Sequence, residues 1–328
     1  MKTLKLFITT AIVGLFMSSC SKETGVDNTN IAPPNVTAFK ELREKALKDI
    51  AIIKIFNTSA GIDFTTTKGT KVTFSPNSIV DQSNQSFLGN VSFSIADIYD
   101  RGTMVVTNKA LMGKDAQGNL RPLVTGGQIF TELKSENTSV KLSFGNFYNI
   151  QMPSAHTEGI DIDMKSWTGN INSDGNLEWE ENMPWSHDVV FSTPNLNVGN
   201  YNIALSKFGW FNIDRFYPYI GNTTKIKLKA PLSYNKQNSS VYIAFSGEPE
   251  VLAQLNEYNP IDAYFTENYG FSPIGMTIHI IFVTESNGNL AYALKTTTVT
   301  ANQLITINQN DIQQISSQNL VNLVNQLN

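Results

Sequence analysis

Residues 277–299 read TIHIIFVTESNGNLAYALKTTTV, and this stretch decides the fold. Apolar residues dominate positions 277–285, and a second apolar-rich run follows from 290 to 299. The four residues between the runs, Ser286-Asn287-Gly288-Asn289, have the composition of a tight turn, because Asn and Gly tolerate a positive φ. The stretch therefore predicts a β-hairpin of two long strands.

Similar strand patterns recur along most of the chain. Each is an alternation or a short apolar run bounded by turn residues, which is typical of antiparallel strands. We expect strands at 71–74, 91–95, 128–133, 140–144, 149–152, 225–230 and 241–245. No helical crossover pattern separates them, which argues against a parallel α/β enzyme fold. The predicted fold class is all-β: two β-sandwich domains with an N-terminal amphipathic helix and a C-terminal helix.

Helical periodicity is confined to a few segments. Residues 37–50 place Phe39, Leu42 and Ala46 on one face, which predicts an amphipathic helix that packs on the body following it. Residues 311–328 carry a second apolar stripe, and we expect a terminal helix packed on the second domain, with partner docking as the alternative. Residues 250–258 predict one or two helical turns.

The N-terminus has the order of an export signal. Lys2 and Lys5 precede an apolar stretch at 6–17, and Ser18-Ser19 stand before Cys20. The stretch is too short to span a bilayer. A cysteine at the cleavage point predicts lipidation of its sulfur and a membrane anchor, and the segment resembles a bacterial lipobox. Cys20 is the only cysteine, so the folded body has no disulfide.

Changes in composition along the chain predict the domain boundaries. Residues 1–19 are predicted as the signal peptide and 20–35 as a polar, lipid-anchored linker. Residues 36–60 hold the helix and a lead-in strand. The first β-sandwich domain is predicted at 61–220, and the second, with the C-terminal helix, at 221–328.

Three motifs in the first domain carry a resemblance. They are GTKVTFSPNS at 69–78, GNVSF at 89–93 and GGQIF at 126–130. Over 61–152 they resemble the sandwich repeat of Bacteroidota-type surface lipoproteins and, more distantly, the β-sandwich domain of netrin receptors and ankyrins. The second block, with Gly275 before a long strand and an Asn-Gly hairpin, resembles carboxypeptidase-regulatory or transthyretin-like sandwiches. Both resemblances imply binding or scaffold modules.

Charge and reactive residues narrow the function. The formal net charge of −4 argues against a nucleic-acid partner, which needs a basic surface. His156, His187 and His279 are far apart, and His187-Asp188 lacks the Gly-x-Ser-x-Gly elbow of a hydrolase. Carboxylates at 161–163 and 178–181 could pair for glycoside cleavage, although exposed strand faces normally carry such groups. We expect neither an enzyme nor a cofactor.

The densest aromatic segment is GWFNIDRFY at 209–217. Its candidate ligand-binding residues are Trp210, Asp214, Arg215, Phe216 and Tyr217, which could stack on sugar rings and hydrogen-bond to them. The alternative is structural: the rings pack two sandwiches together, and Asp214 and Arg215 neutralise each other.

A weak calcium candidate lies at Asn170, Asn172, Asp174 and Glu181, with oxygen-bearing side chains near the spacing of a calcium loop. The alternative for the same residues is a β-hairpin with Ser173-Asp174-Gly175-Asn176 as its turn.

Together these patterns predict a lipid-anchored protein of the outer membrane, at its periplasmic face or on the cell surface. Its expected role is non-catalytic binding or scaffolding, with other surface proteins or glycans as partners. The alternative function is glycan binding through the aromatic residues near Trp210.

Overall fold

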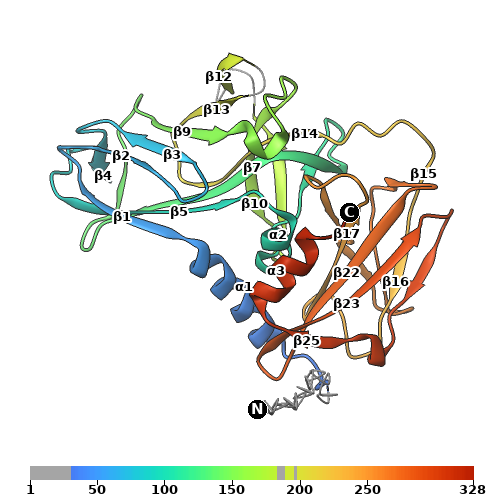
Figure 1. The fold of residues 1–328 in the computed structure, drawn as a ribbon. Coiled ribbons are helices and arrows are strands. Elements are labelled where there is room, and N and C mark those ends of the chain that lie inside the picture. The colour runs from blue at the N-terminus through green and yellow to red at the C-terminus, as the bar shows by residue number, and fades with distance from the viewer. Residues whose placement is uncertain (1–30, 183–188, 196–197) are drawn as a thin grey trace, which may run out of the picture. The chain divides into compact units, whose positions relative to one another are not determined.

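The computed structural model describes residues 31–182, 189–195 and 198–328, and residues 31–328 form one compact unit. Strands far outnumber helices in these ranges, which confirms the predicted all-β fold class (Figure 1). None of the helices described there is long and apolar enough to cross a membrane.

The largest sheet has seven strands. In spatial order they are β1 (Ile52–Asn57), β5 (Asn90–Ile98), β7 (Leu120–Lys134), β14 (Gly209–Phe216), β10 (Lys165–Ile171), β11 (Leu177–Glu181) and β6 (Met112–Lys114). β6 pairs with β11 and also with β7, so five of these strands close into a ring. Closure of the ring leaves these strands without free edges there. The interior of the ring is tightly packed: a methyl group at Gly169 would lie 2.7 Å from the Trp179 ring, so glycine is needed at this position.

A second sheet packs on the open part of the first. Its order is β12 (Val190–Asn195), β13 (Val198–Leu205), β9 (Tyr148–Pro153), β3 (Lys71–Phe74) and β2 (Ile62–Thr65). Phe93 of the first sheet meets Phe74 of the second with ring centroids 5.0 Å apart, and Phe74 stacks on Tyr148 at 4.8 Å. A small two-stranded sheet, β4 (Ile79–Asp81) with β8 (Val140–Leu142), lies nearby in the chain.

Residues after 220 form two further packed sheets. One has β18 (Leu252–Gln254), β17 (Ser239–Phe245), β22 (Thr277–Ser286), β23 (Asn289–Thr298) and β25 (Gln313–Ile315). The other has β19 (Glu257–Asn259), β20 (Tyr264–Thr266), β16 (Lys227–Lys229) and β24 (Leu304–Thr306), and a short pair joins β15 (Thr223–Thr224) to β21 (Ser272–Pro273). Phe282 and Phe265 bring the two larger sheets together, with ring centroids 6.2 Å apart. The hairpin predicted from 277–299 is confirmed as β22–β23.

The sheets divide at residue 220, but other contacts join residues on its two sides. No sheet of the described residues draws strands from both sides of this position, whereas an isolated bridge joins Val124 to Val251. The proposed boundary between 220 and 221 stays a prediction.

The helices only partly match expectation. α1 (Val36–Ile50) is confirmed, with Asn35 capping its first turn by accepting from the Ala38 N–H at 2.9 Å. The helical turns expected at 250–258 are wrong, because β18 and β19 occupy that segment. The C-terminal helix is shorter than expected: the segment forms a 3₁₀ turn (Gln309–Asp311), β25 and then α3 (Ser317–Asn325). A second 3₁₀ turn covers Ser154–Thr157, and α2 (Arg101–Thr107) was not anticipated.

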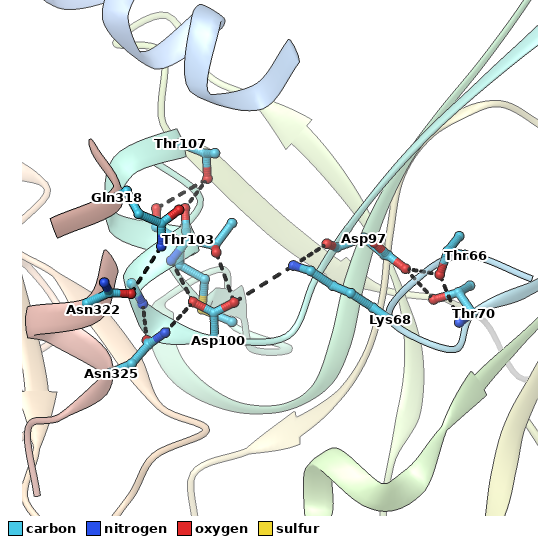
Figure 2. A network of polar contacts seen from close by, with 12 residues as sticks. Thr66, Lys68, Thr70, Asp97, Asp100, Thr103, Thr107, Gln318, Asn322 and Asn325 are labelled. Carbon is cyan, nitrogen blue, oxygen red and sulfur yellow. Dashed lines mark hydrogen bonds and ion pairs between the residues drawn. The ribbon is translucent and has the colours of Figure 1, made fainter. Parts of the chain in front are cut away.

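α3 packs against α2, a helix whose seven residues are all buried (Figure 1). Asp100 caps α2 by accepting from the Thr103 N–H at 2.8 Å, and Asn325 of α3 donates to the same carboxylate at 2.9 Å (Figure 2). The Gly102 N–H donates to Asn325 at 2.7 Å. The Arg101 guanidinium donates to the Leu327 carbonyl. Thus α3 bonds to residues that precede position 220, and not only to the second block as expected.

We expect Gly102→Ala to lower the free energy of unfolding by about 2 kcal/mol. A methyl group there would lie 2.3 Å from the Val321 carbonyl oxygen and 2.7 Å from its Cα, so the backbones of α2 and α3 would have to separate. Urea unfolding measures the change. Gly89→Ala is the control, because its methyl would meet only the Phe87 ring, at 3.2 Å. Equal midpoints for the two variants would contradict this packing argument.

Candidate functional site

The aromatic segment forms β14 and lies largely inside the protein. Trp210, Asp214 and Tyr217 are 7%, 0% and 4% exposed, whereas Arg215 and Phe216 are partly buried. The five residues therefore do not form one exposed stacking face. Trp210 and Phe216 line two different clefts.

The proposed neutralisation of Asp214 by Arg215 is wrong. Successive side chains of a strand point to opposite faces, so neighbours cannot pair. Arg215 instead donates to Asp161 at 2.5 Å. Asp214 accepts from the Asn212 amide, and its burial raises its pKa well above the usual value.

The calcium candidate folds as the alternative hairpin. β10 pairs with β11 around the turn at 173–176, and the Asn172 side chain accepts from the backbone N–H groups of Asp174 and Asn176, each at 3.0 Å. The acidic side chains diverge: Asp174 pairs with Lys236 at 2.9 Å and Glu181 with Lys165 at 2.7 Å. The structure thus does not bring Asn170, Asn172, Asp174 and Glu181 together around one point.

The reactive groups named from the sequence also stay apart. His156 stacks on Tyr99 with ring centroids 3.9 Å apart, and His279 hydrogen-bonds Thr296 at 2.9 Å. Within residues 31–182, 189–195 and 198–328, no three His, Cys, Asp or Glu side chains are placed to hold a metal. Cys20, His187 and Asp188 lie outside the described residues.

A cleft of about 600 Å³ lies beside α1, within the range of small-ligand sites. Six segments build it: α1, the end of α2, one residue each of the paired strands β7 and β14, the β10–β11 turn, and the loop at 236–237. Its lining residues are Val36, Phe39, Lys40, Arg43, Glu44, Leu47, Thr107, Asn108, Lys109, Phe130, Ile171, Ser173, Asp174, Gly175, Trp210, Lys236 and Gln237.

Each of two cations in this cleft sits over an aromatic ring. The Arg43 guanidinium carbon lies 3.8 Å from the centroid of Phe39, one turn away on α1, and donates to the Ser240 hydroxyl at 2.5 Å. The Lys109 Nζ lies 5.2 Å from the Trp210 centroid. The ring faces attract both charges and restrict where they lie.

Lys109 is the more unusual of the two, because it is only 9% exposed. It follows Asn108, the left-handed residue that ends α2. Burial, with a smaller contribution from the nearby Arg43 charge, lowers the pKa of Lys109 to about 8. Its nearest hydrogen-bond acceptor is the Asn108 carbonyl, at 3.5 Å.

Asn108 joins two of the segments that line the cleft. Its amide donates to the Gly175 carbonyl at 3.1 Å and to the Asn176 side chain at 3.2 Å, which ties the β10–β11 turn to the end of α2. Its side-chain Oδ1 accepts from the Tyr242 hydroxyl at 2.5 Å. The cleft is therefore preorganised by buried hydrogen bonds between these segments.

Sequence reasoning found Trp210 but missed Lys109 and Arg43. The signal for Lys109 was a lone lysine in the apolar stretch VVTNKALM at 105–112, where a solvated charge is out of place. Arg43 gave no such signal, because arginines are ordinary on an amphipathic helix.

Comparison with models of known protein families found no match, and neither did comparison with curated proteins. The resemblances to Bacteroidota-type surface lipoproteins and to transthyretin-like sandwiches therefore stay predictions.

We expect Lys109→Met to raise the free energy of unfolding by about 2 kcal/mol at pH 7, because the variant buries no ammonium group. The pKa is about 8 in the folded protein and near its ordinary 10.5 when unfolded. Between these values the unfolded chain binds more protons, so wild-type stability rises with pH and the advantage of the variant shrinks. Urea unfolding at pH 7 and pH 10 measures both values.

The matched control for that measurement is Lys227→Met, which removes a lysine lying 4.7 Å above the Tyr264 ring, outside the cleft. A Lys109→Met variant that is less stable than wild type at pH 7 would contradict the burial cost of the ammonium.

Proposed function

We propose that this chain is a lipid-anchored, non-catalytic binding protein of the outer membrane, held through Cys20 at the periplasmic face or on the cell surface. The anchor is supported by the order of charged, apolar and small residues before that cysteine. A lipid tether positions a folded body at a membrane without any spanning segment.

The cleft beside α1 is the single observation that carries the binding role. It combines a volume suited to a small ligand with aromatic and apolar walls and a few fixed polar groups, the usual composition of a binding site. Four of the five carboxylates considered for glycoside cleavage are in ion pairs: Asp161 with Arg215, Glu178 and Glu180 with Lys114, and Glu181 with Lys165. These pairs favour binding over catalysis.

Glycan binding near Trp210 is the alternative function, and one observation favours it. Trp210 contributes to the cleft wall next to Phe130, with ring centroids 5.1 Å apart. Sugar contact would thus involve this wall of the cleft, not a flat platform that includes Phe216 and Tyr217.

We expect Cys20→Ser to abolish incorporation of labelled palmitate and to release the protein from the membrane fraction, because serine cannot form the thioether. Metabolic labelling followed by fractionation measures both. Ser19→Ala is the matched control, since it keeps a small residue before the cysteine. Labelling that persists in Cys20→Ser would overturn the anchor.

We expect Ile171→Trp to block the cleft. Ile171 lines it and is 49% exposed, so a larger ring there fills space without disturbing the core. In a thermal-shift screen of saccharides, peptides and small organic acids on the full chain in detergent, ligands that stabilise wild type should fail to stabilise Ile171→Trp. Leu304→Trp, at a 55% exposed position outside the cleft, should respond as wild type does. Identical shifts for both variants would place binding elsewhere.

A further inference from the structure

The cleft beside α1 is positively charged, although the chain as a whole carries a formal net charge of −4. Its lining has four basic side chains, Lys40, Arg43, Lys109 and Lys236, against two acidic ones, Glu44 and Asp174. Subtraction leaves an excess of two positive charges. Such a local excess attracts an anionic ligand.

The two acids do not neutralise the inner cations. Glu44 faces Lys40 at 3.8 Å, and both side chains are largely exposed. Asp174 is paired with Lys236 at 2.9 Å. The Lys109 ammonium and the Tyr242 hydroxyl are also close to Arg43, and that hydroxyl donates to the Asn108 side chain.

Arg43 and Lys109 are thus left without an internal anion. In the part of the chain that the structure describes, neither makes an ion pair within 4.0 Å. A cation buried like Lys109 is costly unless an opposite charge meets it. Since both residues line one cleft, an anion bound there would lie near both charges.

The rest of the lining indicates what carries the anion. Ser173 and Gln237 supply a hydroxyl and an amide, and Leu47, Phe130 and Ile171 supply apolar surface. Neutral hydrogen-bonding groups beside apolar and aromatic surface match the hydroxyls and the C–H face of a sugar ring. The two cations match a carboxylate on the same ring.

We propose that this cleft binds an acidic saccharide, with the carboxylate of a uronic acid held between Arg43 and Lys109. The inference rests on the proposed binding role and names its ligand class. Arg43 offers a fork of N–H donors to the carboxylate, and Lys109 offers a point charge from the floor beside Trp210.

Titration calorimetry on the full chain in detergent tests the ligand class. The probes are disaccharides containing glucuronate, galacturonate or mannuronate, and their neutral hexose counterparts. We expect at least one acidic disaccharide to bind at least tenfold more tightly than its neutral counterpart. Inorganic phosphate and a glutamate-containing tripeptide form the other arms, and both should bind more weakly than that disaccharide.

Two variants tie the binding to the cations. Arg43→Gln and Lys109→Met should each lower the affinity for the acidic disaccharide at least tenfold and leave the affinity for its neutral counterpart unchanged. Lys227→Met, which removes a ring-stacked lysine outside the cleft, should leave both unchanged. Circular dichroism of each variant shows whether it is folded, and the two cleft variants provide independent readings if one fails to fold.

The pH dependence gives a further reading. Lys109, with its pKa near 8, loses its charge as pH rises, so affinity for the acidic disaccharide should fall up to about tenfold from pH 7 to pH 9. Lys109→Met should show no such fall.

Three results would overturn the ligand class. They are equal affinity for acidic and neutral sugars, tighter binding of the tripeptide or of phosphate, and no acidic disaccharide binding with Kd below 10 mM. In the first two cases the Ile171→Trp blocked cleft would still lose binding, so the proposed binding role would stand. If the protein incorporates palmitate but no saccharide, peptide or organic acid raises its melting temperature in the thermal-shift screen, the binding role itself would be refuted.

Discussion

The backbone hydrogen bonding of β7 is the constraint on which the rest of the structure depends. This strand pairs with β5, β14 and β6, and its Val124 also bridges Val251 beyond position 220. It must change partners along its length, and Gly127, at φ +125°, lies within it. A methyl group there would lie 2.3 Å from the Tyr99 ring, so only glycine fits. The open sheet, the closed ring and one wall of the cleft therefore share a single strand.

Local patterns predicted much of this fold, because hairpins are encoded by neighbouring residues. The turns at 173–176 and 286–289 and their flanking strands are read from composition and period alone. α2 could not be found in this way. Its sequence, RGTMVVT, is rich in β-branched residues, which are typical of strands, and all seven residues are buried, so no exposed polar side marks it as a surface helix. The segment at 250–258 misled for a different reason: its two strands, β18 and β19, are only three residues long, so they are too short to show a strand alternation even though they pair with the neighbouring strands β17 and β20.

The candidate site was less predictable than the fold, because it is assembled from six separated segments. Trp210 was identified because it lies in the densest aromatic segment of the chain. Its ring is mostly buried, so it contributes to one wall of the cleft and does not form an exposed flat surface. Arg43 and Lys109 acquire meaning only when α1 and the end of α2 come together in space. Sequence spacing cannot report that two like charges face the same cavity.

The contact between α2 and α3 also affects how the chain is made. Asp100 and Asn325, which bond directly, are separated by 225 positions. Synthesis proceeds from the N-terminus, so α2 must wait for more than half of the chain before its partner exists. During that interval its apolar surface has no permanent cover, and the entropy of closing so long a loop delays docking further. The last helix of the chain therefore completes the cover of a helix made near its beginning.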